Sequence, residues 1–159
     1  MNKKIIIDIE EFESINELSL DDQELFKKAT DATSLSYAPY SQFHVGAAIR
    51  LNNNEIVLGA NQENASYSAT ICAERVALSA ISSSHPKQTI KAIAVTYRSN
   101  GVNQSTLSPC GICRQSLLEH EDRIKQPIKV ILGSRSGKIV IFKSVADTLP
   151  LHFTGSNLF

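Results

Sequence analysis

The tightest constraint on the fold of this chain is the short connection between its last two predicted strands. Apolar, β-favouring runs at residues 128–132 and 138–142 are separated by only five residues, Gly133-Ser-Arg-Ser-Gly137. Parallel neighbours need a crossover of about a dozen residues or more, so these two strands can pair only in antiparallel order. The connection also leaves no room for a helix between them.

The rest of the chain alternates between helical and β patterns. A helix is predicted to begin near Ser19 to Asp21, where Asp21 and Glu24 form a capping box, and to end before Pro39. The triplet Asn52-Asn53-Asn54 predicts a hairpin turn, because asparagine tolerates positive φ. This order of elements predicts an α/β fold, a three-layer α/β/α domain with a mixed sheet of about five strands. The remaining predicted elements are strands at 43–51, 55–60 and 90–97, helices at 71–81 and 110–120, and a short helix at 145–149.

Residues 19–159 are expected to form a single domain, because no linker or repeat divides them. The segment 1–18 fits either an edge strand or an arm on the surface. Its apolar pattern is too short to decide between the two, and we assign no function to it.

Charge and hydropathy narrow the range of partners. Lys+Arg and Asp+Glu both number 16, and no block of consecutive basic residues could follow a phosphate backbone. A small, near-neutral ligand therefore fits this chain better than a nucleic acid. The apolar run after Lys3 and Lys4 ends too early for a signal peptide, and no stretch approaches the roughly 18 apolar residues that span a bilayer. We expect a cytoplasmic protein with no membrane partner.

The cysteines fall into two short motifs, each at a predicted helix start. The chain has three of them, and an odd number in a reducing compartment argues for thiolate chemistry or a metal rather than for disulfides. Cys110 and Cys113 are three residues apart, which places both sulfurs on one side of a first helical turn. If Cys72 is the third ligand, a zinc ion keeps one open tetrahedral position, as catalytic zinc does. Glu74 follows Cys72 closely enough to exchange protons with a water at that position without binding the metal.

Together, Cys72-Ala-Glu74 and Pro109-Cys-Gly-Ile-Cys113 match the three-cysteine form of the zinc deaminase signature. Taken alone, C-x-x-C fits half of a zinc ribbon or a redox dithiol, and a lone buried cysteine fits an inert apolar side chain. A ribbon needs a fourth cysteine or a histidine at ligand spacing, and the histidines of this chain are isolated. A noncatalytic zinc-binding or redox protein is the alternative from a different class.

Five blocks, in order, resemble the small, usually homotetrameric cytidine deaminases. The resemblance runs from Tyr37 to about Leu158. It implies zinc-dependent hydrolysis of cytidine and deoxycytidine to uridine and deoxyuridine, with release of ammonia, in pyrimidine salvage. It also implies one Zn²⁺ per chain and a homotetramer with shared active sites. The blocks are Tyr37–Ala48, Gly59–Ser68, Ile71–Arg75, Ser108–Gln115 and Leu149–Phe153.

By this resemblance Cys72, Cys110 and Cys113 are the zinc ligands, and Glu74 is the catalytic proton shuttle. Arg75 is implied to hydrogen-bond the ligand thiolates. Three thiolates give the zinc site a net negative charge, and a guanidinium that draws charge from sulfur restores acidity to the bound water.

The same resemblance implies the contacts to the nucleoside. Asn61 and Glu63 are two apart on extended chain, so their side chains face the same way. An amide beside a carboxylate suits a sugar hydroxyl, and the family places this pair on the ribose 3′-hydroxyl. Phe43 is implied to pack on the cytosine ring, although its pattern alone predicts a core residue. Ala73 is implied to offer its backbone N–H to the base carbonyl. Phe153 is implied to reach the base site of a neighbouring subunit, with a core position as the alternative.

Two other deaminase classes agree less well with the sequence. A deaminase of a cytosine-nucleoside antibiotic such as blasticidin shares the zinc motif, but the family uses the intact block at 61–64 for unmodified ribose. Nucleic-acid deaminases place a helix between the last two strands, for which residues 133–137 leave no room. For Arg114, a solvated helix position and a role near the metal both remain open.

Overall fold

The computed structural model describes residues 2–100 and 106–158, and within them a single mixed sheet organises the chain. The sheet has six strands in the order β1-β6-β5-β4-β2-β3 over these residues. Strand β4 runs parallel to β5, and every other neighbouring pair is antiparallel. The strands are β1 (Ile9–Phe12), β2 (His44–Leu51), β3 (Ile56–Ala60), β4 (Ile90–Arg98), β5 (Lys129–Gly133) and β6 (Ile139–Phe142).

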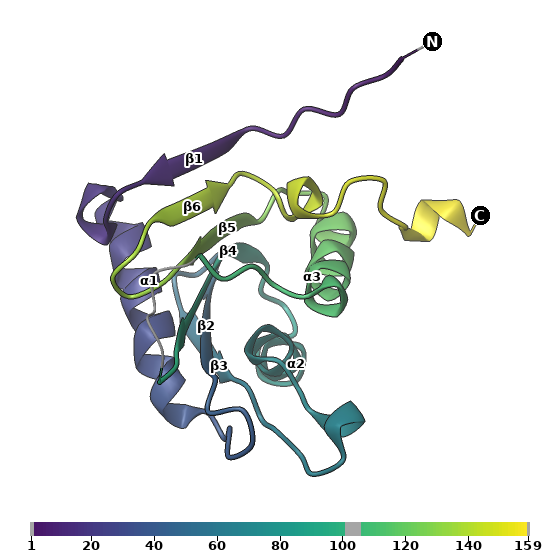
Figure 1. The fold of residues 1–159 in the computed structure, drawn as a ribbon. Helices are drawn as coiled ribbons and strands as arrows, with labels where there is room; N and C mark the ends of the chain where they lie inside the picture. The colour runs from purple at the N-terminus through teal and green to yellow at the C-terminus, as the bar shows by residue number, and fades with distance from the viewer. Residues whose placement is uncertain (1, 101–105, 159) are drawn as a thin grey trace.

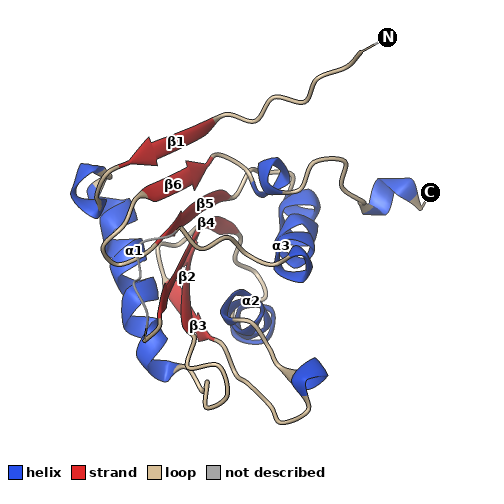
Figure 2. Ribbon diagram, in the orientation of Figure 1, coloured by secondary structure: helices blue, strands red, loops and turns tan. Residues whose placement is uncertain are grey.

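Helices cover both faces of the sheet, which confirms the predicted three-layer α/β/α architecture. Helix α1 (Leu20–Ala32) lies on one face, and α2 (Ala73–Ser84) and α3 (Gly111–Ile124) lie on the other (Figures 1 and 2). Short 3-10 turns, among them Val145–Thr148, fill several connections. No helix in the described part of the chain combines the length and the apolar character needed to cross a membrane.

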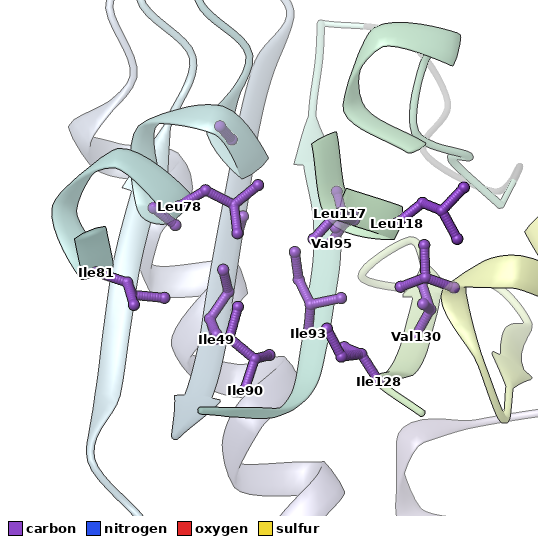
Figure 3. Close-up of a cluster of buried hydrophobic side chains, with 14 of the residues drawn as sticks. Ile49, Leu78, Ile81, Ile90, Ile93, Val95, Leu117, Leu118, Ile128 and Val130 are labelled. Atoms are coloured by element: carbon purple, nitrogen blue, oxygen red, sulfur yellow. The ribbon is translucent and has the colours of Figure 1, made fainter. Parts of the chain in front are cut away.

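The larger of two apolar clusters fills the space between the sheet and the pair α2 and α3. Leu78 and Leu117 extend from these helices over Ile49, Ile93 and the neighbouring strand residues (Figure 3). The second cluster, on the other face, packs α1 against the alternate residues of the same strands. Since the central strands are covered on both faces, their apolar runs are continuous, as in the strand predicted at 90–97.

The last two strands pair as the short connection requires. β5 and β6 are antiparallel, with Leu132 opposite Val140. The parallel pair β4 and β5 is joined through α3, a crossover long enough for that geometry. The asparagine turn between β2 and β3 is also confirmed, and Asn54 has a φ of 68° there.

Two sequence predictions need correction. The sheet has six strands in the described chain instead of about five, because β1 pairs with β6 and so realises the edge-strand alternative for the N-terminal segment. The cap of α1 is Ser19, whose hydroxyl accepts the Asp22 backbone N–H at 3.2 Å, and Asp21 lies in the first turn. Glu24, the other half of the predicted box, instead pairs with Arg50 at 2.8 Å.

Candidate active site

The starts of α2 and α3 meet on the same side of the sheet. Cys72 is the N-cap residue of α2 and Cys110 is the N-cap residue of α3, and neither side chain makes a capping hydrogen bond. Serine, threonine, aspartate and asparagine are the stabilising residues at this position, so these thiols are oriented by another requirement. Two helix N-termini converge there, and both favour negative charge on sulfur.

The three sulfur atoms form one compact cluster. The Sγ atoms of Cys72 and Cys110 are 3.9 Å apart, and those of Cys110 and Cys113 are 3.5 Å apart. All three lie within 4.8 Å of one another. Two zinc–sulfur bonds of about 2.3 Å at a tetrahedral angle place their sulfurs about 3.8 Å apart. The donor set and its spacing therefore fit a tetrahedral zinc ion with three protein ligands.

The thiols of the cluster shift the pKa of one another in opposite directions. Hydrogen bonding from Cys113, then from Cys110, together with the charge of Arg75, lowers the pKa of Cys72 to about 6. The same hydrogen bond with Cys72, together with burial, raises the pKa of Cys113. A thiolate is the form that binds zinc, so the fold prepares Cys72 as a ligand.

Glu74 lies in the first turn of α2, directly after the Cys72 cap. Its side chain is 3% exposed, and burial raises the pKa of its carboxyl group, with the negative charge of Cys72 adding to the effect. A carboxyl group with a raised pKa next to a metal site is suited to general acid–base catalysis. Ala73, the first residue of α2, is fully buried, and its backbone N–H has no acceptor within the helix.

A close contact between β3 and α2 positions this first turn. A Cβ atom on Gly59 would lie 2.2 Å from the carbonyl oxygen of Ala73 and 2.7 Å from the nitrogen of Ala77. Only a glycine lets the helix approach the strand so closely. The bridge between Gln62 and Ile71 then brings the start of α2 alongside the chain at 61–63.

Asn61 and Glu63 both hold the loop that precedes β2. Asn61 is buried, and its Oδ1 accepts the Val45 backbone N–H at 2.8 Å and the Ser36 hydroxyl at 2.5 Å. Its Nδ2 donates to the carbonyl oxygen of Phe43 at 2.9 Å. The backbone around Asn61 is extended, as the sequence predicted, and Gln62 bridges it to Tyr37 and Ile71.

Glu63 faces a surface hollow of about 370 Å³. Its Oε2 accepts the Tyr40 backbone N–H at 2.9 Å, and its Oε1 accepts the Ser41 hydroxyl. These hydrogen bonds, chiefly that from Ser41, hold the pKa of Glu63 below its usual value. The hollow is lined by Tyr40, Ser41, Glu63, Tyr67 and Thr70.

Phe43 is half-buried and stacks on Tyr97 of β4, with ring centroids 4.8 Å apart and an interplanar angle of 20°. Asn61 donates to the carbonyl oxygen of Phe43, so the Asn61 amide fixes the backbone of the residue that carries this ring. Tyr97 was not identified from the sequence, because nothing local links a residue of β4 to the loop before β2.

The two arginines near the cysteines act differently from one another. Within the described residues Arg75 makes no hydrogen bond to a cysteine, and its side chain lines a hollow between α2 and α3 with Ser116 and His120. It lowers the pKa of Cys72 through its charge alone. Arg114 donates to the carbonyl oxygens of Pro109 at 2.8 Å and Thr148 at 2.7 Å, which ties α3 to the peptide before Cys110. For Arg114 the sequence left open a solvated helix position or a role near the metal, and these hydrogen bonds support a role near the cysteine cluster.

Phe153 is separate from the site within one chain. Its side chain is 56% exposed, so the core alternative is wrong for the single chain. Its carbonyl oxygen accepts from Gln115 Nε2 at 3.0 Å, a single link to α3, and beyond α3 the C-terminal segment extends away from the body of the protein (Figure 1).

The fold and the site thus define an α/β protein with three clustered thiols, a donor set that fits zinc, and an adjacent buried carboxyl group. Residues 19–128 match the family described as the cytidine and deoxycytidylate deaminase zinc-binding region. The chain therefore belongs to this deaminase family.

Individual relatives cover nearly the whole chain. The cytidine deaminase of Halalkalibacterium halodurans is 38% identical over 139 residues, which cover 87% of this chain and 98% of that protein. The blasticidin-S deaminase of Bacillus cereus is 32% identical over 141 residues, covering 86% and 95%. The crystal structure of cytidine deaminase from Burkholderia pseudomallei has a TM-score of 0.69 at 37% identity, covering 82% of this chain and 97% of that one.

Proposed function

We propose that this chain is a zinc-dependent enzyme that hydrolyses cytidine and deoxycytidine to uridine and deoxyuridine, with release of ammonia, as a step of pyrimidine salvage. The observation that carries the proposal is the convergence of three thiols and the buried Glu74 at two helix starts. The family to which the chain belongs supports the same reaction.

Cys72, Cys110 and Cys113 would hold one zinc ion, which when bound supplies a water molecule whose pKa is lowered to about 7. Glu74 moves the protons. Its carboxylate takes a proton from the attacking water and delivers it to N3 of the cytosine ring, which makes C4 electrophilic. The Glu74 carboxylate then takes the remaining hydroxyl proton of the C4 addition product and gives it to the departing amino group, so that a C=O bond replaces the C–N bond at C4 and ammonia leaves.

The remaining residues of the proposed site orient the nucleoside. Both acceptor sites that Asn61 Oδ1 offers are filled, but its Nδ2 has one N–H left to donate. Glu63 can only accept. A sugar hydroxyl that accepts from Asn61 and donates to Glu63 satisfies both groups, which suits the ribose 3′-hydroxyl. Phe43 would pack on the base, and the Ala73 N–H would bind its carbonyl oxygen.

The test is an ultraviolet assay of zinc-loaded protein with cytidine, wild type beside Glu74→Gln. Glu74 is not proposed as a ligand, so the variant should keep its zinc and its fold while losing the proton shuttle. General acid–base catalysis contributes about 10²–10⁴-fold, and turnover should fall by at least that much. Glu119→Gln, an exposed carboxylate on α3, is the matched control and should retain activity. Turnover of Glu74→Gln within about tenfold of wild type would show that another group carries the proton.

A deaminase of cytosine-nucleoside antibiotics is the second candidate, favoured by the similarity to the Bacillus cereus protein. Such an antibiotic does not carry an unmodified ribose, so it is expected to contact Asn61 and Glu63, the sugar clamp, differently from cytidine. Parallel assays with cytidine, 2′-deoxycytidine, 3′-deoxycytidine and blasticidin S separate the two. We expect the first two to react well, because the clamp is assigned to the 3′-hydroxyl. Preferential turnover of blasticidin S would favour the second candidate.

We further propose a homotetramer with shared active sites, located in the cytoplasm. The exposed Phe153 supports the shared site, because a neighbouring subunit is the simplest partner for an exposed aromatic ring. Free thiols in a metal cluster are stable in a reducing compartment, which supports the location. Exposed apolar side chains of the loops and helix starts around the site also support assembly: Tyr37, Tyr40, Tyr67, Ile71 and Ile112.

A further inference from the structure

The N-terminal segment leaves the body of the protein as an extended, apolar chain (Figure 1). β1 is the end strand of the sheet and pairs with β6 alone among the described strands. Residues 2–8 continue from β1 without strand pairing. Ile5, Ile6 and Ile7 are 61%, 82% and 38% exposed, and Ile9 of β1 is 51% exposed. An exposed apolar edge of this kind is a template for pairing with another chain.

We propose that residues 3–11 pair in antiparallel order with the same residues of a second copy of this chain, about a two-fold axis at Ile7. In this register Ile7 lies opposite Ile7 of the second copy, and Ile5 lies opposite Ile9. Lys3 lies opposite Glu11, and Lys4 lies opposite Glu10. Each apolar residue of the odd-numbered face meets an isoleucine, and each lysine meets a glutamate, while on the even-numbered face Ile6 lies opposite Asp8.

This register also keeps the two sheets continuous. Directly opposite residues of antiparallel strands project from the same face, and the register pairs odd positions with odd and even with even. Phe12 packs with the apolar cluster under α1, while Ile9 lies opposite Phe142, which packs with the cluster under α2 and α3. The helix layers of both copies therefore remain on matching sides of one extended sheet.

The neighbouring registers have fewer opposite-charge pairs. A shift of two residues toward the N-terminus pairs Lys4 with Asp8 and keeps isoleucines opposite one another, but it places Lys3 opposite Ile9 and Glu10 opposite Asn2. The opposite shift places Asp8 against Asp8 of the second copy and Ile5 against Glu11. Like charges opposite one another oppose pairing, so the charges select the register while burial of the isoleucines drives association.

Glu10 and Glu11 can each form an ion pair with a lysine of the second copy in addition to the ion pair within their own chain. Glu11 pairs with Lys138 at 2.6 Å and Glu10 with Lys143 at 3.6 Å, yet the glutamate side chains remain 49% and 48% exposed. The outer edge of β1 is therefore accessible at both carboxylates.

The test is residue-specific cross-linking of zinc-loaded, full-length protein. Opposite residues of antiparallel strands have Cα atoms about 4.5–5.5 Å apart, within reach of a disulfide. Under mild oxidation Ile7→Cys should therefore run mostly at twice the chain mass on a non-reducing gel. Ile5→Cys is the control, because the two copies of residue 5 would lie about 14 Å apart. Wild type treated in the same way, with its zinc content measured, shows whether the native cysteines remain intact.

A mixture provides the second arm. Ile5→Cys and Ile9→Cys should each stay mainly as single chains, whereas a mixture of the two should cross-link, because residue 5 faces residue 9. Equal cross-linking of Ile5→Cys and Ile7→Cys would overturn the register and indicate unspecific encounters. If Ile7→Cys remained at the mass of one chain, the pairing itself would be refuted, whatever assembly the protein forms through other surfaces.

Discussion

At the scale of single residues, the proposed site depends on side chains that serve the fold as well as the substrate. Asn61 uses its oxygen and one N–H to hold the loop before β2, and only one donor remains for a ligand. Arg114 supports the proposed metal ligands from the backbone side, because it fixes the peptide of Pro109 and the C-terminal segment at Thr148. Such supporting contacts orient ligand side chains that the metal alone would not hold in place.

We expect Arg114→Met to weaken zinc binding by about 10–100-fold, the usual cost of removing a residue that supports a metal ligand. Its hydrogen bonds to the Pro109 and Thr148 carbonyl oxygens would be lost, and Cys110 would be less firmly placed. Competition with a chelator measures the affinity. Arg123→Met, an exposed position on the same helix, is the control. Equal affinities of the two variants would contradict the role assigned to Arg114.

At the scale of elements, the close packing of β3 against the first turn of α2 fixes the position of Cys72 and Glu74. The contact depends on Gly59, because any side chain there meets the backbone of α2. A change in the distance between β3 and α2 would displace Cys72, because Cys72 caps this helix.

Gly59→Ala should therefore lower both stability and zinc content. Overpacking of this kind costs about 1–3 kcal/mol, and the added methyl group would push α2 away from β3. Urea unfolding and metal analysis of the purified variant measure the two effects. Gly155→Ala is the matched control, because a Cβ there has no neighbour within 4 Å. A Gly59→Ala protein with wild-type stability and full zinc would show that α2 tolerates the shift.

The elements were predictable from the sequence where the signal is local. The cysteine motifs, the asparagine turn and the antiparallel order of β5 and β6 all follow from residues close in the chain. The α1 cap was misplaced because Ser19 and Asp21 are both good capping residues, and only the structure shows which one bonds to the backbone. Whether the N-terminal segment forms an edge strand, and whether Phe43 stacks on Tyr97, depends on partners distant in sequence, which no local pattern encodes.

At the scale of the whole molecule, the described part of one chain leaves several apolar and aromatic groups exposed, among them Phe153 of the C-terminal segment and the isoleucines of the N-terminal segment. The proposed homotetramer and the proposed strand pairing are assigned to different residues, so they can be tested independently.

We expect Phe153→Ala to raise the KM for cytidine and to weaken the tetramer, because the ring would close the base pocket of a neighbouring subunit. Truncation of an aromatic residue at an interface centre typically costs more than about 2 kcal/mol, or roughly thirtyfold in affinity. Kinetics and solution mass are measured together. Leu158→Ala, an exposed apolar residue of the same segment, is the control. A fully active wild-type monomer would rule out the shared pocket.

The pairing of β1 with β6 sets an order of events during synthesis. Residues 9–12 emerge from the ribosome long before their partner strand at 139–142 is made. At about 5–20 residues per second, the N-terminal strand waits on the order of ten seconds for β6. Throughout this interval Ile9 and Phe12 of β1 have no partner strand, and several nascent chains on one messenger RNA would expose these side chains side by side. The pairing of the edge strand therefore depends on how fast a distant part of the chain is completed.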